Sequence, residues 1–277
     1  MHRAEIAVNV WNQKLSAFMK GLEQDDDSHG WHHLLRVRTV ALQLAAGLPC
    51  DEEILTAAAW LHDLVVLPKN HPDRKISSTL SAERAEKLLH QMGFPQEKIA
   101  AVCHAIAAHS FSAGITPETT EAKIVQDADR MEALGALGML RCFYTSGRLG
   151  RHLMHEEDPL AKERALNDVE YALDHFEVKL FKLEERFNTE RGRALAHLRT
   201  EWLREFRTLL LSGDEGALQV AKSCERAGRE SKKLFDGEDP FAKKRRPQPE
   251  VYFLDEFCRW KPKAAGNFIG QLASELP

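Results

Sequence analysis

A histidine and an aspartate stand next to each other, His62-Asp63, within the apolar run of residues 57–66. If this run is helical, His62 falls on its apolar face and Asp63 at the edge of that face, so both side chains point inward or nearly so. A buried carboxylate costs several kcal/mol unless its pKa rises or a cation neutralises it. Residues 59–67 contain no lysine or arginine, so the neutralising cation has to come from elsewhere.

Two further residues of ligand type occupy inward-facing positions of other predicted helices. His33 shares the apolar face of residues 33–44, and Asp129 shares that of residues 125–140. Three helices would then direct nitrogen and oxygen atoms to one buried point, as metal sites in helical bundles do. Each residue alone is also compatible with a structural role, as a hydrogen-bonded core histidine or as a carboxylate that joins two helices.

The elements that position these residues are predicted to be helices. Apolar residues recur at helical spacing along residues 1–212, and strand-like alternation is hard to find, which predicts an all-α fold. The expected helices run to Gly47, from about Asp51 to Pro68, from about Ser77 to Gln91, around Ile99–His109, and over about 118–146. The last of these is apolar or small on most faces, which predicts a central, closely packed helix.

Two later apolar stripes, within residues 169–187 and 195–209, predict long helices that pack as an antiparallel C-terminal hairpin. The composition changes after residue 212. We therefore expect one helical domain over residues 1–212 and a C-terminal extension over 213–277 that is partly helical, basic and proline-containing.

The extension contains an internal repeat. Residues 238–257 match about half of residues 157–176 in ungapped register. One hypothesis is that the extension occupies the groove made for the first copy, within a chain or between two protomers of a homodimer. The alternative is chance, or a local duplication without a function.

Composition limits the classes of function. A hydrophobic content of 43% with 29% charged residues indicates a globular chain, and a net charge of −4 provides no general basic field, so nucleic-acid binding is disfavoured. The five cysteines are odd in number and widely spaced, which argues against a disulfide framework or a thiolate zinc site and favours a reducing cytoplasm. No stretch approaches the roughly 20 apolar residues needed to cross a bilayer, so no membrane association is expected.

The ordered set of motifs resembles a known family. His33 lies in His32-His33-Leu34-Leu35-Arg36-Val37, His62-Asp63 follows, and Asp129 lies in Gln-Asp-Ala-Asp-Arg-Met-Glu-Ala-Leu-Gly-Ala-Leu-Gly at 126–138, with His109-Ser110 between them. Over roughly residues 25–190 the chain resembles the HD domain superfamily of metal-dependent phosphohydrolases, and looks closest to a bacterial branch of HD hydrolases. The resemblance implies the helical HD-domain fold and hydrolysis of phosphate esters or anhydrides, commonly of nucleotides.

The resemblance also implies roles for single residues. His33, His62, Asp63 and Asp129 would hold a divalent ion (Mn²⁺, Mg²⁺, Fe²⁺ or Zn²⁺, with Mn²⁺ or Mg²⁺ favoured), and Asp63 would also help to orient the attacking water. His109 would bind a second metal or the substrate phosphate. Asp127 is expected to hydrogen-bond a ligand histidine. The candidate cations for an anionic substrate are Lys69, Arg74 and Arg130.

One departure narrows the substrate. Alarmone hydrolases of the superfamily place a Glu-Asp pair soon after His-Asp, whereas this chain has Val65-Val66. The prediction is therefore hydrolysis of a small phosphorylated metabolite, with nucleoside triphosphates or monophosphates as the expected substrates. Two alternatives remain: a non-catalytic sensor that binds metal and nucleotide, and a helical scaffold that binds no metal.

Overall fold

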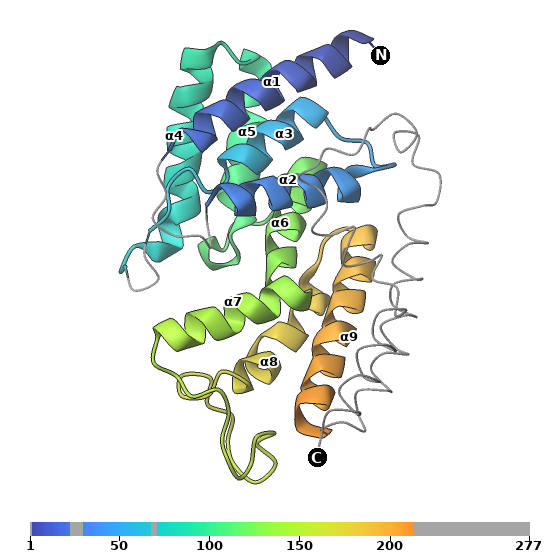
Figure 1. Cartoon of the computed structure of the whole chain (residues 1–277). Coiled ribbons are helices and arrows are strands. Elements are labelled where there is room, and N and C mark those ends of the chain that lie inside the picture. The colour runs from blue at the N-terminus through green and yellow to red at the C-terminus, as the bar shows by residue number, and fades with distance from the viewer. Residues whose placement is uncertain (1, 23–29, 68–70, 213–277) are drawn as a thin grey trace, which may run out of the picture. The chain divides into compact units, whose positions relative to one another are not determined.

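The computed structural model describes residues 2–22, 30–67 and 71–212, with side chains from residue 7 onward. The chain divides between Gly213 and Asp214, so all described residues belong to the first unit. They form α-helices and 3₁₀ turns without a strand (Figure 1), which confirms the all-α prediction. The helices are α1 (His2–Lys20), α2 (Trp31–Ala45), α3 (Glu52–Leu61), α4 (Ser77–Met92), α5 (Gln96–His109), α6 (Thr120–Arg130), α7 (Gly135–Arg148), α8 (Asp174–Val178) and α9 (Glu190–Ser212).

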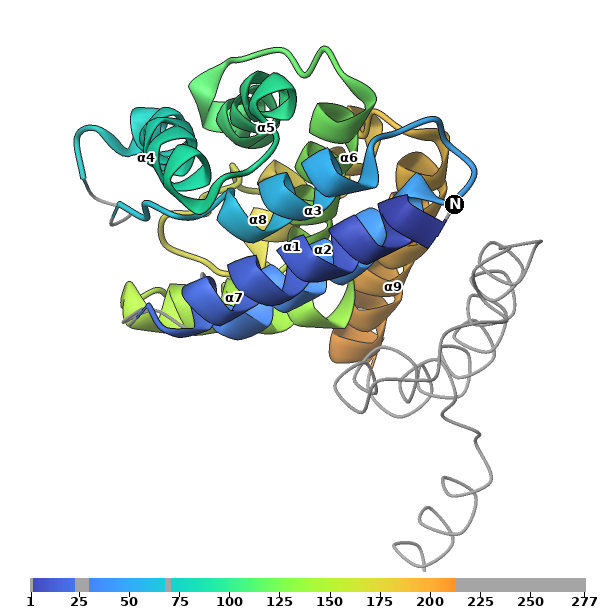
Figure 2. The ribbon, with the colours of Figure 1, turned by 90° about the horizontal axis from the view of Figure 1, so that it is seen from above.

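Helix α3 lies at the centre of the helices that surround the candidate site. It packs against α1, α2, α5 and α6 (Figure 2), and residues 54–61 are all buried. Its first turn is capped by Asp51, whose Oδ1 accepts the amides of Glu53 and Ile54 at 2.9 and 3.2 Å. Alanines at 57–59 allow the neighbouring helices to approach closely, so the end of α3 is fixed deep inside the bundle.

Helix α3 ends earlier than the sequence predicts, at Leu61 rather than near Pro68. The amide of Val65 turns away from the helix and donates to the hydroxyl of Ser81 at 3.0 Å, while the Val65 carbonyl accepts from Ser77 Oγ at 2.8 Å. Side chains of α4 thus take over the backbone groups that a longer helix would have paired. His62 and Asp63 consequently stand at the C-terminal end of α3 rather than in its middle.

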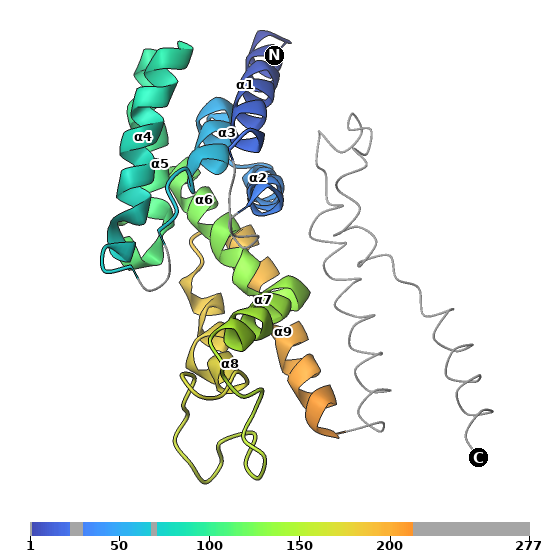
Figure 3. The same ribbon diagram turned by 60° about the vertical axis from the view of Figure 1, so that its left-hand side comes forward.

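The single helix predicted over 118–146 is interrupted. Helix α6 is followed by a 3₁₀ turn, Met131–Ala133, and α7 then leaves in a new direction (Figures 1 and 3). Gly135 has φ +73°, which disfavours other residues, and a Cβ on Gly138 would lie 2.2 Å from the carbonyl of Ala133. The small residues of this run therefore permit a sharp turn rather than a continuous central helix.

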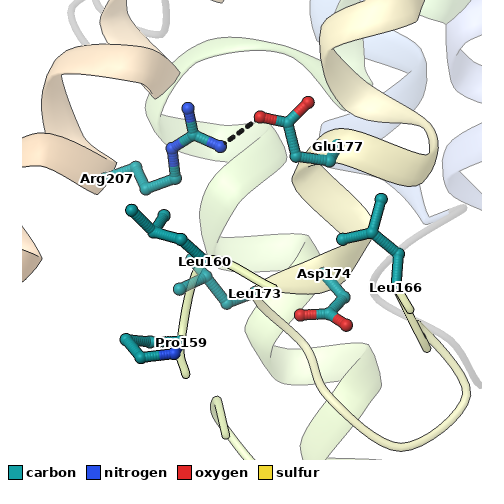
Figure 4. Close-up of a pocket in the computed structure, with 7 residues that line it drawn as sticks. All are labelled: Pro159, Leu160, Leu166, Leu173, Asp174, Glu177 and Arg207. Atoms are coloured by element: carbon teal, nitrogen blue, oxygen red, sulfur yellow. Dashed lines mark hydrogen bonds and ion pairs between the residues drawn. The ribbon is translucent and has the colours of Figure 1, made fainter. Parts of the chain in front are cut away.

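The prediction of a long helix as the first arm of the hairpin is wrong. Within residues 169–187 only α8 and two 3₁₀ turns, Leu180–Lys182 and Glu184–Arg186, are helical, whereas α9 forms as the second arm. An ion pair holds the irregular segment: Arg164 donates to both oxygens of Asp174 at 2.6 and 2.7 Å. The predicted apolar positions divide accordingly, since Phe176 is buried and Val169 is 74% exposed. Figure 4 shows a hollow beside Asp174 that is lined by Leu160, Leu166 and Leu173. The ion pair between Glu177 and Arg207 of α9 lies at the same hollow.

The predicted C-terminal extension lies outside the described residues. The same holds for the second copy of the repeat, so the groove hypothesis and the homodimer stay predictions. In the part of the chain that the structure covers, no helix combines the length and hydropathy that crossing a membrane requires.

Candidate metal centre

Four of the predicted ligands meet at one point between α2, α3 and α6. The Nε2 atoms of His33 and His62 are 3.1 Å apart. Asp63 Oδ2 lies 3.3 Å from His33 Nε2 and 3.6 Å from His62 Nε2, and Asp129 Oδ1 lies 3.6 and 3.9 Å from the same two atoms. Residues that are far apart in the sequence thus bring two imidazole nitrogens and two carboxylates together, and His33, His62 and Asp129 have ligand atoms mutually close enough for one ion.

His109, the last residue of α5, joins this cluster from the other side of Asp63. Its Nε2 atom is 3.6 Å from Asp63 Oδ1, and its ring lies edge-on to that of His62 with 4.9 Å between centroids. Two sets of residues have ligand atoms close enough for an ion: His33, His62 and Asp129, and His62, Asp63 and His109. Both sets use His62, so they describe one centre rather than two separate ones.

Backbone carbonyls determine the tautomers of two of these histidines. A carbonyl only accepts, so His62 Nδ1 donates to Ala59 at 2.9 Å and His109 Nδ1 donates to Ile106 at 2.7 Å. In the neutral ring the Nε2 atom then carries a lone pair and is available as a ligand. The cluster thus contains the Nε2 lone pairs of His62 and His109. They face His33 Nε2 and the carboxylates of Asp63 and Asp129. A positive charge is required at their centre, supplied either by a proton on His33 or by a metal ion.

Burial and the carboxylates act in opposite directions on the two innermost histidines. Burial alone would lower the pKa of His33, but hydrogen bonds to Asp63 and Glu132 raise it to about 9. Burial dominates at His62 and lowers its pKa to about 4, against the attraction of Asp63. Without a metal ion, a proton is therefore favoured on His33 over His62.

Glu132 is a functional candidate that the sequence interpretation missed. It lies in the 3₁₀ turn after α6 with a side chain only 5% exposed, and its Oε2 is 3.4 Å from His33 Nδ1. Arg36 donates to it from Nε at 3.0 Å and from Nη2 at 2.8 Å. Burial would raise the pKa of Glu132, but His33 and Arg36 lower it to about 2. The ionised carboxylate thus holds the His33 ring in place.

A signal for Glu132 exists in the sequence. Arg36 follows His33 by three residues and Glu132 follows Asp129 by three, so each pair shares a helical face. An acidic residue one turn beyond a predicted ligand, opposite an arginine one turn beyond another, would have indicated the contact.

Asp127 does not bind a ligand histidine, contrary to the prediction. Its carboxylate accepts the amides of Asn188 and Thr189, both at 2.8 Å, and the hydroxyl of Thr189 at 2.8 Å. Burial raises the pKa of Asp127, and these donors oppose the increase. A Cβ on Gly192 would come within 2.5 Å of Asp127 Oδ2, so only glycine fits there. Asp127 therefore anchors the start of α9 to α6.

The three candidate cations for substrate have different surroundings. Lys69 lies outside the described residues. Arg74 donates from Nη1 to the carbonyl of Leu67, a contact that secures the loop after α3. Arg130 donates to the carbonyl of Arg186. None of these contacts brings a cation to the ligand cluster itself, so their roles toward a substrate remain predictions.

Known proteins resemble this chain in both sequence and fold. A family model of the HD domain matches residues 30–134. The uncharacterized protein YpgQ of Bacillus subtilis is 30% identical over 205 residues, which are 72% of this chain and 88% of that protein. The crystal structure of B. subtilis YpgQ in complex with ADP is 27% identical with a TM-score of 0.54, over 75% of this chain and 94% of the other.

A second solved structure agrees. An HD-superfamily hydrolase from Bacillus thuringiensis is 29% identical with a TM-score of 0.58, over 74% of this chain and 96% of the other. The family predicted from the ordered motifs is confirmed. With its helices, its His-Asp pair and these relatives, the chain belongs to the HD domain family.

Proposed function

We propose that the protein is a metal-dependent phosphohydrolase that acts on small phosphorylated metabolites, with nucleotides as the substrate class. The observation that carries the proposal is the convergence of His33, His62, Asp63 and Asp129, whose facing atoms require a positive charge. In a purely structural scaffold this arrangement would be unfavourable, because bringing two ionised carboxylates together raises the free-energy cost of burying them.

The donor set fits a divalent cation. Ligand atoms about 2.1 Å from an octahedral ion lie about 3.0 Å apart in adjacent positions and about 4.2 Å apart in opposite positions. The separations between the two imidazoles and the two carboxylates, 3.1 to 3.9 Å, fall in this range. Mixed nitrogen and oxygen ligands suit Mn²⁺, Mg²⁺, Fe²⁺ or Zn²⁺, and the proposal favours Mn²⁺ or Mg²⁺. Four protein ligands would leave room at the ion for water and a phosphate oxygen.

When bound, the ion lowers the pKa of a water and offsets the charge that develops on the phosphoryl group. The chain's own residues orient the reactants. Asp63 directs Oδ2 to the two inner histidines and Oδ1 to His109. In the proposal the same carboxylate also helps to orient the attacking water. We assign His109 to the substrate phosphate, and Lys69, Arg74 and Arg130 to holding the anionic substrate by charge.

The proposed substrate class rests on a relative and on a sequence difference. B. subtilis YpgQ was solved in complex with ADP, which supports a nucleotide for this chain. Val65-Val66 stands where alarmone hydrolases carry an acidic pair, which disfavours guanosine alarmones. Nucleoside triphosphates and monophosphates both remain within the proposal.

The proposed compartment is the cytoplasm. Cys50 and Cys103 carry free thiols in the described part of the chain. Burial, with nearby carboxylates, raises the pKa of Cys50 and of Cys103 to about 11. Such thiols stay protonated at neutral pH and are poor nucleophiles, which is in keeping with a structural role in a reducing environment.

The test is a turnover screen of the full chain. Metal-stripped protein is reloaded with Mn²⁺ or Mg²⁺ and offered nucleoside tri-, di- and monophosphates, with phosphate and pyrophosphate release measured separately. We expect turnover of at least one class, and its loss in the double variant His62→Ala, Asp63→Ala. His197→Ala, an exposed histidine on α9, is the matched control. Metal and nucleotide binding without any turnover would indicate the sensor instead, and absence of metal binding would indicate the scaffold.

A further inference from the structure

The metal centre is most accessible on the side of Asp129. The side chains of His33 and His62 are 0% exposed and that of Asp63 is 13% exposed, whereas that of Asp129 is 31% exposed. A substrate therefore approaches along the end of α6, where the next residue is Arg130. Any group that holds the rest of the substrate should lie beside this residue.

Three side chains from separate parts of the chain gather there. Phe111 follows α5, Arg130 ends α6 and Arg186 precedes α9. The guanidinium carbon of Arg186 lies 4.7 Å from the centroid of the Phe111 ring, and that of Arg130 lies 5.8 Å from it. Arg130 is also 5.8 Å from the ring of Phe187, and it donates to the Arg186 backbone. Phe111, Arg130 and Arg186 are called the arginine–phenylalanine cluster below.

The charges of this cluster are not neutralised by direct ion pairs. Across residues 30–67 and 71–212, the guanidiniums of Arg130 and Arg186 have no carboxylate oxygen within 4.0 Å, whereas Arg36, Arg164 and Arg207 each have one. Two neighbouring cations beside a phosphate-processing centre favour binding of an anion with several charges.

The aromatic ring adds a second, independent property. Phe111 is 65% exposed, although Phe187 beside the same guanidinium is only 4% exposed. Burial of apolar surface therefore does not explain the position of Phe111. An exposed ring next to paired guanidiniums offers a stacking surface for a nucleobase, since every base has a face that packs on an aromatic ring.

We propose that the arginine–phenylalanine cluster is a nucleotide subsite, in which Arg130 and Arg186 hold the phosphates remote from the metal centre and Phe111 packs against the base. The inference rests on the proposed function for the location of the reacting phosphate. It favours nucleoside di- and triphosphates over monophosphates, because a monophosphate at the metal centre leaves the two guanidiniums without a phosphate.

The experiment measures binding rather than turnover. The metal-stripped full chain is titrated with ADP and with tripolyphosphate, which has no base, by isothermal titration calorimetry. For Arg186→Gln we expect about 10-fold weaker binding of both probes, because a charge-assisted phosphate contact is lost. For Phe111→Leu we expect ADP to bind about 5-fold to 10-fold more weakly and tripolyphosphate to bind within 2-fold of the wild type, because only stacking is removed.

The chain provides a matched control in Arg148, which lies 5.8 Å from the exposed ring of Tyr144 on α7, a helix without a proposed ligand. Arg148→Gln should leave both affinities unchanged. Melting curves check that Arg186→Gln and Phe111→Leu fold, and Arg186→Lys should recover part of the tripolyphosphate affinity.

The inference is overturned if wild type binds no ADP, or if the two variants bind like wild type. An active enzyme with unaffected variants refutes the subsite alone. A protein that binds ADP through the cluster but turns nothing over refutes the enzyme and keeps the subsite.

Discussion

Residues 30–134 and residues 169–187 both carry apolar side chains at helical spacing, but they form different backbones. In the first region the pattern corresponds to regular helices whose ends carry His62, His109 and Asp129 into one cluster. In the second region the same kind of pattern corresponds to a short helix and irregular turns around the ion pair of Arg164 with Asp174. Periodicity thus identifies which residues are buried more reliably than it identifies the backbone that buries them.

The two regions also use buried charge for different purposes. Around the candidate metal centre like charges are brought together, which is unfavourable without a cation. Around Asp174 opposite charges meet at 2.6 and 2.7 Å and satisfy each other. The first arrangement is expected to contribute function at a cost in stability, and the second to contribute stability alone.

The largest expected effect follows from removing ligands of the first region. The double variant His62→Ala, Asp63→Ala should lose more than about 100-fold in turnover, because even residues that only orient a ligand contribute roughly 10-fold to 100-fold. Thermal stability without metal should also fall, since truncation of the buried His62 leaves a cavity and Asp63 no longer stabilises the protonated His33. Steady-state kinetics and metal-free melting curves measure both. Wild-type turnover in the variant would contradict the account.

Glu132→Gln tests the orientation of His33. The amide keeps the shape but loses the charge, so Mn²⁺ affinity should fall about 10-fold to 100-fold. Calorimetric titration of the metal-stripped protein measures this without reference to activity. The control Glu184→Gln removes a carboxylate that pairs with Arg204 away from the ligand set, and should leave the affinity unchanged. Equal Mn²⁺ affinity in Glu132→Gln and wild type would show that Glu132 does not position the ring.

Asp174→Asn tests the second region. Loss of the ion pair should lower the free energy of unfolding by on the order of 2 kcal/mol at pH 7, with Mn²⁺ affinity unchanged. Burial alone would raise the pKa of Asp174, but hydrogen bonds from Arg164 and the Asn167 amide lower it. The contribution is therefore present above the unfolded pKa of about 3.9 and is lost as pH falls through the lower folded value.

Unfolding of wild type and Asp174→Asn should consequently differ at pH 7 and converge below about pH 4. Denaturant titrations at both pH values measure the difference. A gap that persists or widens in acid would have the wrong sign for a carboxylate with a lowered pKa.

The smallest effect is expected at Val169. A continuous helix over 169–187 would bury this side chain, but it is 74% exposed. Val169→Ser should therefore change the free energy of unfolding by less than about 0.5 kcal/mol. Phe176→Leu, at a fully buried position seven residues later, is the contrasting variant and should destabilise the protein by more than 1 kcal/mol, roughly. A similar loss of folding free energy in both variants would instead support the predicted helix over residues 169–187.

The sequence was sufficient for part of this fold and site. The start of α3 at Asp51, the all-α class and the convergence of His33, His62, Asp63 and Asp129 follow from spacing and residue type, because each is a local property or a shared helical face. The end of α3 could not be predicted, since it depends on the Ser77 and Ser81 hydroxyls of another helix. The partner of Asp127 likewise comes from residues 188 and 189, more than 60 positions away.

The most direct measurement is anomalous diffraction from crystals of the full chain grown with Mn²⁺. The account predicts one strong anomalous peak within bonding distance of His33, His62, Asp63 and Asp129, and its absence in the His62→Ala, Asp63→Ala variant. A peak elsewhere, or none at this cluster at saturating Mn²⁺, would contradict the claim that these four side chains form a metal centre.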